Sequence, residues 1–172
     1  MALSRFAVLV AVVLATPGAL TWSDEQPPDA PPAPVVAHFP WTGADAPPTV
    51  AGLHLGDTRA TVEAALGAAT QLRPMGSGLA LEYTSQGLSI VLGAKGDVSM
   101  IYLLSRTAGS IDGVRVGDSR QEVLAHWGVP PLVQGAQAMY PAGDWAVVAE
   151  LGPEQRVLTL SLGRAYGNTE LR

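Results

Sequence analysis

The chain offers few residues whose types and spacing suit catalysis. Its three histidines are His38, His54 and His126, and none belongs to a zinc-binding or nucleophile-activating motif. Asp57 and Asp118 recur as a pair, and paired carboxylates can perform acid–base chemistry. Each of them, however, stands at the expected start of a helix, where a carboxylate serves as a cap or as a partner of the helix dipole. We therefore predict no catalytic residue, no metal ligand and no cofactor.

The segments around these two aspartates have similar sequences. Residues 52–67 align without gaps on residues 113–128, and the identity of seven positions out of sixteen indicates an internal duplication. In the second copy, Ser119 and Glu122 have the spacing of a capping box, which closes the first turn of a helix. A glycine ends each copy where a C-terminal cap is needed. Each copy is therefore expected to form a helix of two to three turns, which is too short to be stable without a sheet to pack on.

Three strand-length apolar runs follow each expected helix, separated by turn residues. They cover residues 79–83, 88–92 and 98–105 after the first helix, and 137–140, 145–151 and 157–162 after the second. A unit of about 60 residues buries only a marginal core, so the two units are expected to share one core or one sheet. We predict an α+β fold in which two tandem repeats, each a helix plus an antiparallel hairpin or meander, form one domain. Both helices are expected on one face of the sheet.

The repeated pattern Gly-Asp-Thr/Ser-Arg-x-x-Val, closed by a glycine, resembles the repeat of the secreted β-lactamase-inhibitor proteins. It also resembles the single-copy unit of the BamE (SmpA/OmlA) outer-membrane assembly lipoproteins. The resemblance rests on Gly56, Asp57, Thr58, Arg59, Val62 and Gly67, and on Gly117, Asp118, Ser119, Arg120, Val123, Leu124 and Gly128. It implies a similar architecture and carries no activity with it. The cysteines of the inhibitors and the lipid-bearing cysteine of the lipoproteins have no counterpart here.

Composition divides the chain into five segments. We predict a signal peptide at residues 1–23, a Pro-rich spacer at 24–48, two repeats at 49–108 and 109–166, and a tail at 167–172. Eight of the fourteen prolines fall within the spacer, where they favour extended polyproline geometry and prevent a hydrogen-bonded core.

The leader has the layout of a secretory signal peptide. Arg5 is its one charged residue, and an unbroken apolar run over residues 6–15 precedes a Pro-Gly break. Ten helical residues span about 15 Å, half the hydrocarbon core of a bilayer. Small residues allow cleavage after Ser23 or after Ala15, and an uncleaved anchor is the alternative. We expect a periplasmic or secreted protein with no stable membrane span after cleavage.

The spacer contains two aromatic residues, Phe39 and Trp41. Large apolar rings are costly to leave in water. We expect both rings to fold back onto the domain, and a short docking motif for a partner is the alternative.

Charge and cysteine content exclude several classes of protein. Ten Lys and Arg against fifteen Asp and Glu give a net charge of −5, so no basic surface is available for nucleic acid. The absence of cysteine excludes disulfides, thiolate metal sites and a cysteine nucleophile. The folded part must therefore be stabilised by its core.

Strand alternation predicts which side chains lie on the open face of the sheet. Ile101 and Leu103, with Leu158, Leu160 and Leu162, are assigned to the helix side. The opposite side is the candidate partner-binding face, formed by Met100, Tyr102, Glu82, Glu150, Thr159 and Ser161, with Val91 and Val148 as further members. A merely solvated face and a face covered by the spacer are the alternatives.

These observations together predict a non-catalytic, exported protein-binding module that uses the open sheet face. Its partner is expected to be another exported or envelope protein, as for an accessory or inhibitor-like protein. A small-ligand carrier and an envelope enzyme are the alternatives. A carrier requires an enclosed apolar cavity, whereas an enzyme requires a pocket that gathers His54 or His126 with carboxylates.

Overall fold

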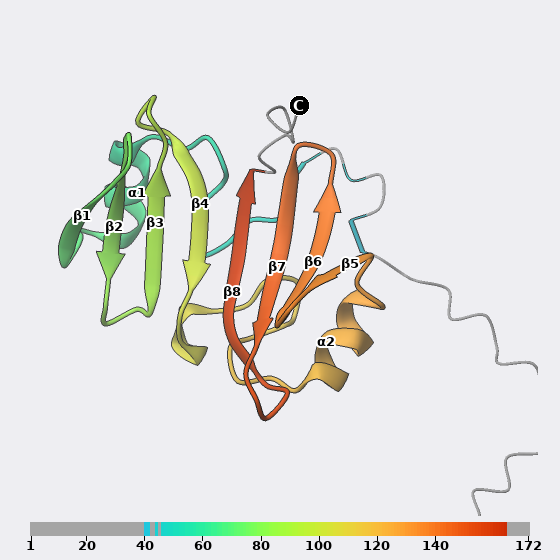
Figure 1. Ribbon diagram of the computed structural model, residues 1–172. Helices are drawn as coiled ribbons and strands as arrows, with labels where there is room; N and C mark the ends of the chain where they lie inside the picture. Colours follow the sequence, from blue (N-terminus) through green and yellow to red (C-terminus); the bar gives the residue numbers. More distant parts are fainter. Residues whose placement is uncertain (1–39, 42–43, 45, 165–172) are drawn as a thin grey trace, which may run out of the picture. The chain divides into compact units, whose positions relative to one another are not determined.

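The computed structural model describes residues 40–41, 44 and 46–164 of the chain, all of which belong to one compact unit, Val36–Arg172. They form an eight-stranded sheet with two short α-helices and one 3₁₀ turn (Figure 1). The predicted signal peptide, most of the spacer and the tail lie outside the described residues. The elements in chain order are α1 (Arg59–Leu66), β1 (Gln71–Met75), β2 (Gly78–Tyr83), β3 (Leu88–Leu92), β4 (Val98–Leu103), η1 (Arg106–Ala108), α2 (Arg120–Trp127), β5 (Leu132–Gln134), β6 (Gln137–Ala142), β7 (Trp145–Leu151) and β8 (Val157–Arg164).

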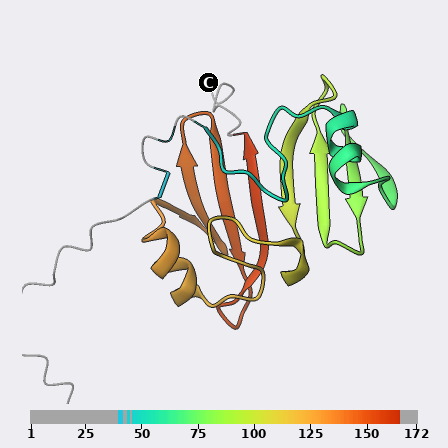
Figure 2. The same ribbon diagram turned by 180° about the vertical axis from the view of Figure 1, so that it is seen from behind.

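All neighbouring strands run antiparallel, in the order β1-β2-β3-β4-β8-β7-β6-β5. The strands form two meanders of four, which meet where β4 pairs with β8. Figure 2 looks onto the face that carries both helices and the long connections, and Figure 1 looks onto the opposite face. One sheet, covered on one side, therefore organises the described part of the chain.

The predicted fold of two helix-plus-hairpin repeats is wrong. The six predicted strands and both helices are present, but the structure is mainly one open antiparallel sheet of eight strands with two eight-residue helices. The outer strands β1 and β5 were not predicted, because all their residues are exposed and show no alternation of apolar and polar side chains. In the described residues, no helix has the length and apolar character needed to cross a membrane.

Side-chain hydrogen bonds explain where both helices begin. The Thr61 backbone N–H donates to Thr58 Oγ1, at an N–O distance of 3.2 Å. At the second helix, the Ser119 N–H donates to Glu122 Oε2 at 2.6 Å and the Glu122 N–H donates to Ser119 Oγ at 3.3 Å, so the predicted capping box is confirmed. The hydrogen bonds that the Ser119 backbone N–H and the Ser119 hydroxyl donate to the Glu122 carboxylate lower its pKa. The N-caps are thus Thr58 and Ser119, and not the preceding aspartates.

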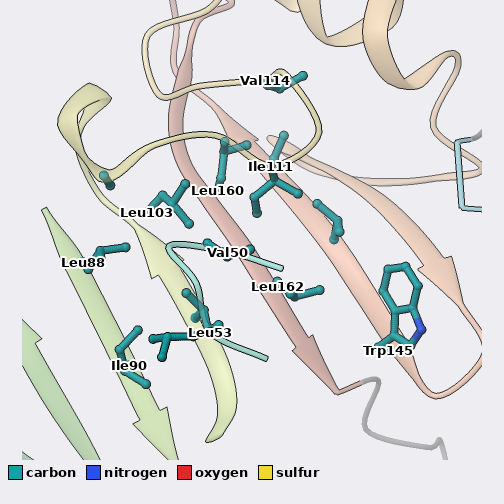
Figure 3. Close-up of a cluster of buried hydrophobic side chains, with 14 of the residues drawn as sticks. Val50, Leu53, Leu88, Ile90, Leu103, Ile111, Val114, Trp145, Leu160 and Leu162 are labelled. Atoms are coloured by element: carbon teal, nitrogen blue, oxygen red, sulfur yellow. The ribbon is translucent and has the colours of Figure 1, made fainter. Parts of the chain in front are cut away.

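The core lies between the sheet and the segments that cross its helix-bearing face. Val50 and Leu53 form one isolated backbone bridge and Ile111 and Val114 form another, and all four side chains are fully buried. Figure 3 shows them over the strands that carry Ile90, Leu103, Leu160 and Leu162. The connections before each helix therefore fill much of the space that longer helices would occupy in a typical α+β domain.

An aromatic cluster closes the core beside α2. Trp41 is only 6% exposed, and its ring lies 5.2 Å from that of Trp127, 6.4 Å from Tyr140 and 6.0 Å from Trp145, between centroids. Such tilted and edge-to-face pairs stabilise a cluster beyond the apolar area that they bury. The expectation that the spacer aromatics fold back is confirmed for Trp41, whereas Phe39 lies outside the described residues.

Tyr140 gives the fold a testable dependence on alkaline pH. Its hydroxyl donates to the Gly128 carbonyl at 3.0 Å, and burial raises its pKa to about 12. An unfolded tyrosine has a pKa of about 10, so between about pH 10 and 12 the unfolded chain releases this proton first and the folded state loses stability as pH rises. At pH 8 we expect Tyr140→Phe to lower the free energy of unfolding by about 1 kcal/mol, because the hydrogen bond is lost. Between pH 9 and 12, however, the free energy of unfolding of this variant should fall by about 2 kcal/mol less than that of the wild type.

Urea denaturation at several pH values measures both effects. Tyr83→Phe is the matched control, because the Tyr83 hydroxyl makes the corresponding bond to the Gly67 carbonyl at the longer distance of 3.3 Å. Equal pH slopes for Tyr140→Phe and the wild type would show that Tyr140 does not keep its proton in the folded state.

Candidate functional site

The face of the sheet opposite the helices is the candidate site. We call it the open face; side chains that alternate with the core residues of the strands point to it. The pairing register places Glu82 opposite Ser89, Ser89 opposite Tyr102, and Tyr102 opposite Ser161, so these four residues form one row across β2, β3, β4 and β8. This row connects the two meanders where β4 meets β8.

The other predicted face residues lie beside this row. Met100 stands opposite Gly163, where a Cβ added to the glycine would lie 2.9 Å from the Met100 Cε, so Met100 covers the glycine. Thr159 stands opposite Glu150 in the β7–β8 pair. All six predicted residues thus share the open face, although their role in binding a partner stays a prediction.

The open face is hollowed at its centre. The hollow has a volume of about 310 Å³, and its lining includes four of the six predicted residues. It is lined by Arg73, Met75, Glu82, Ser89, Val91, Tyr102, Leu104, Glu150 and Thr159. A second hollow of about 540 Å³ shares Leu104 with the first and lies between Val116 and Gly117, which precede α2, and the β7–β8 turn with Leu158. Leu104 therefore stands at the junction of two hollows large enough for side chains of another molecule.

Several lining residues were not predicted to belong to the site: Arg73, Met75, Ser89 and Leu104 in the first hollow, and Leu158 among others in the second. Arg73 and Met75 belong to β1, which was not recognised as a strand. Leu104 directly follows β4 and is 48% exposed. Leu158 was assigned to the helix side, and this was wrong, because Leu158 is 52% exposed and lines the second hollow.

A shift in strand register explains the error at Leu158. The β7–β8 pairing shifts between Glu150 and Leu151, so that Val157 takes the buried position and Leu158 is turned outward. The β3–β4 pair shifts in the same way beside Val98, which is also buried. The two hairpins thus share one irregularity, a buried valine directly after the turn with a register shift beside it.

The charges on the open face are unequally compensated. Arg73 Nη2 lies 2.9 Å from Glu82 Oε1, and the Glu82 side chain is only 18% exposed. Glu150 makes no ion pair with any other residue that the structure describes. The first hollow therefore contains one neutralised pair and one carboxylate without a counter-charge.

His54, Asp57 and Asp118 lie in the turns that precede the helices, His126 lies in the last turn of α2, and His38 lies outside the described residues. His54 Nε2 is 2.9 Å from Thr49 Oγ1, and the His126 ring packs so closely on Gly113 that a Cβ added there would lie only 2.7 Å from it. Asp57 Oδ2 accepts the His54 backbone N–H at 2.7 Å, and Asp118 Oδ2 accepts the Arg115 N–H at 2.8 Å. Among the described residues, no three His, Asp or Glu side chains gather as a metal site.

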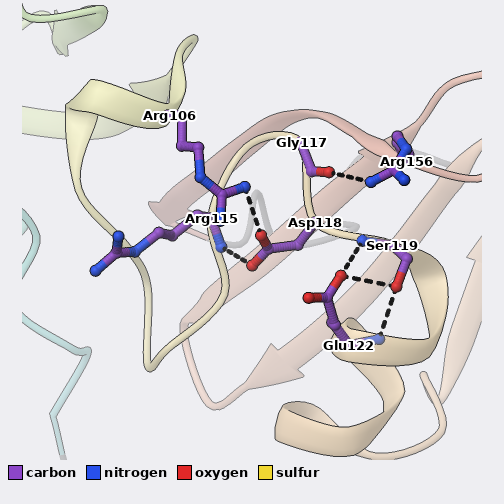
Figure 4. Close-up of polar contacts among 7 residues, drawn as sticks. All are labelled: Arg106, Arg115, Gly117, Asp118, Ser119, Glu122 and Arg156. Atoms are coloured by element: carbon purple, nitrogen blue, oxygen red, sulfur yellow. Dashed lines mark hydrogen bonds and ion pairs between the residues drawn. The ribbon is translucent and has the colours of Figure 1, made fainter.

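Asp118 makes one further contact that Asp57 does not make. Its Oδ1 accepts a hydrogen bond from Arg106 Nη1 at 2.9 Å, and the side chain is 8% exposed (Figure 4). Arg106 belongs to η1, so this bond ties the end of the first meander to the start of the second helix. Both aspartates thus hold the backbone turn that precedes a helix, and only Asp118 also connects two segments of the chain.

Comparisons with known proteins support the fold and leave the activity open. No protein-family model and no curated protein matches the chain. The chain is similar in structure to an extracellular protein containing an SCP domain from Bacillus anthracis str. Ames, with a TM-score of 0.54 and 10% identity over 64% of this chain and 44% of that one. A DUF4309 family protein (YjgB) from Bacillus subtilis subsp. subtilis str. 168 has a TM-score of 0.47 and 14% identity over 63% of this chain and 79% of that one.

The chain thus covers less than half the length of the SCP-domain protein. At 10% identity, this likeness shows a shared fold alone.

Proposed function

We propose that the chain is an exported, non-catalytic protein-binding module whose open face receives its partner. Export is inferred from the leader, in which an apolar run follows Arg5. The structural neighbour from Bacillus anthracis is itself described as an extracellular protein. The partner is then another exported or envelope protein.

One observation carries this proposal. Met75, Leu104 and Leu158 are exposed apolar side chains: Met75 and Leu104 line the hollow of the open face, and Leu104 and Leu158 line the adjoining hollow beside the β7–β8 turn. Exposed apolar side chains that gather around a concave surface, with polar groups at its edge, mark sites of protein interaction more often than single exposed ones do. Tyr102 adds an aromatic side chain of the kind that dominates binding energy at interfaces.

The alternative of a small-ligand carrier has weaker support. The hollow between α2 and the β5–β6 hairpin, lined by Val123, Leu124 and Val133 among others, has a volume of about 160 Å³. Sites for small molecules usually occupy roughly 300 to 1,000 Å³, so this hollow is too small. The hollows of about 310 and 540 Å³ reach this range, but polar side chains such as Arg73 and Glu82 in the first and Glu154 and Arg156 in the second line them, which does not suit an enclosed apolar cavity. The resemblance to the β-lactamase-inhibitor and BamE proteins stays a prediction, because its matching residues form turns and helix starts and lie away from the open face.

Site-specific photo-crosslinking tests the proposed function in the full chain. We expect a photoreactive phenylalanine analogue at Leu104 to yield one discrete adduct with an envelope protein in the producing cell. The same analogue at Val129, which is 50% exposed but lines neither open-face hollow, is the control and should not yield that adduct.

A charge introduced into the hollow should then weaken binding of the identified partner. Leu104→Asp is expected to lower the affinity for the identified partner at least about tenfold, because it places a carboxylate in the apolar contact, whereas Val129→Asp should leave it unchanged. Affinity is measured with purified proteins by surface plasmon resonance. The same adducts from both labelled positions, or equal affinities for both variants, would show that the open face is not the binding surface.

A further inference from the structure

The charge pattern of the open face indicates what chemistry its partner presents. The carboxylate of Glu82 is already occupied by the guanidinium of Arg73, at 2.9 Å. Glu150 lines the same hollow and has no ion-pair partner in the described part of the chain. Glu150 is therefore the position on this face where an incoming cation would gain most and an incoming anion would lose most.

Polar and exposed apolar side chains lie together around Glu150. Its cross-strand neighbours are Gln137 and Thr159, and Thr159 directly follows the exposed Leu158. Leu104, which is similarly exposed, lines the same hollow as Glu150 and also the adjoining one. An occupant that satisfies this surface must combine a positive charge with large apolar side chains within a few residues. Such an occupant also displaces water from the hollow, which reduces the screening of the charge.

We propose that the open face binds a segment of a partner protein in which a lysine or arginine stands beside leucine, methionine or phenylalanine. This inference rests on the proposed function and adds a recognition rule, which states the side chains that the site selects in its partner. In the bound state, the basic group lies at the Glu150 carboxylate and the apolar side chains fill the hollows on either side of Leu104. The Arg73–Glu82 pair borders the site and contributes no net charge.

The chain's own spacer does not meet this description. Residues 24–48 contain no lysine and no arginine, so they lack the basic side chain that the proposed segment requires. The C-terminal residues Leu171 and Arg172 do have the right chemistry, and occupation by this end of the chain is therefore a distinct outcome of the test.

Selection from a random peptide library displayed on phage tests the rule, with the full chain as bait. We expect the wild type to enrich peptides with Lys or Arg within two positions of Leu, Met or Phe. Glu150→Lys should remove this preference and enrich Asp or Glu in its place. Asp144→Lys, which makes the same change in net charge in the turn at the other end of β7, is the matched control and should select the wild-type consensus.

Fluorescence anisotropy with one selected peptide then gives the size of the effect. Glu150→Gln should weaken binding about fivefold, as expected for loss of one partly exposed ion pair, and Glu150→Lys should weaken it further. Exchange of the basic residue in the peptide for Glu should restore binding to Glu150→Lys.

Three results would overturn the inference. The first is that the wild type enriches no peptides, and the second is that Glu150→Lys selects the same consensus as the wild type. The third is that peptides bind only to the Arg172→Glu variant, which would show that the chain's own C-terminal residues occupy the site. If the Leu104 adduct forms while Glu150→Lys keeps the wild-type consensus, the recognition rule fails and the proposed function stands. If neither an adduct nor a consensus is obtained, both fail.

Discussion

Trp41→Ala is expected to lower the free energy of unfolding by about 3–5 kcal/mol, the usual cost of removing a large aromatic side chain from a packed core. The Trp41 ring is almost fully buried against Trp127, Tyr140 and Trp145, and its loss leaves a cavity between them. The Trp127 Nε1 group is buried with no hydrogen-bond partner among the described residues, so water that enters the cavity would recover part of the loss. Urea denaturation followed by far-ultraviolet circular dichroism measures the change.

Two further variants separate packing of the ring from general effects of substitution. Trp41→Phe keeps an aromatic ring in the cluster and should lose less than half as much stability as Trp41→Ala. Val129→Ala, at an exposed position, should change stability by no more than about 0.5 kcal/mol. A chain that begins at Thr49 lacks Trp41 and should be destabilised as much as Trp41→Ala. Wild-type stability in Trp41→Ala would contradict the packing of this ring on the domain.

Asp118→Ala is expected to lower the free energy of unfolding by about 2–3 kcal/mol, whereas the equivalent change Asp57→Ala should lower it by about 1 kcal/mol. The two aspartates occupy matching positions and accept matching backbone bonds, from Arg115 and His54 respectively. Asp118 is buried and also accepts a bond from Arg106, so its removal leaves a cavity, takes the acceptor from the Arg115 N–H and from the Arg106 guanidinium, and frees one end of η1. Asp57 is more exposed, and water can replace its carboxylate.

Chemical denaturation of both variants under identical conditions makes the comparison. Arg106→Ala serves as the control for the ion pair alone, and we expect a loss of about 0.5 kcal/mol because the Arg106 side chain is 61% exposed. Equal losses for Asp57→Ala and Asp118→Ala would show that burial of Asp118 adds nothing to the role that both residues share.

The local structure could be predicted because its causes lie within a few residues of one another. The capping box of Ser119 and Glu122 was found from spacing alone, and the six predicted strands were found from runs of apolar residues between turns. The strands β1 and β5 could not be found in this way. They are held by backbone hydrogen bonds to β2 and β6, and their exposed side chains carry no pattern.

The candidate site was predictable only in part for the same reason. Alternation along the strands placed all six predicted residues on the open face, since it depends on the two-residue period of a strand. The first hollow additionally needs Arg73 from the missed strand β1, and the second needs Leu158, which a register shift turns outward. A shift of this kind depends on how two strands pair, and the alternation of a single strand gives no indication of it.

The sequence by itself thus determined the helix starts, the inner strands and the face on which Tyr102 and Glu150 lie. Only the tertiary structure decided that β4 pairs with β8 to make one sheet, which rings Trp41 contacts in the core, and that Leu104 joins two hollows. The first set follows from side-chain chemistry and short-range periodicity. The second set depends on contacts between segments far apart in the chain, and the pattern of one segment does not specify which other segment it will contact.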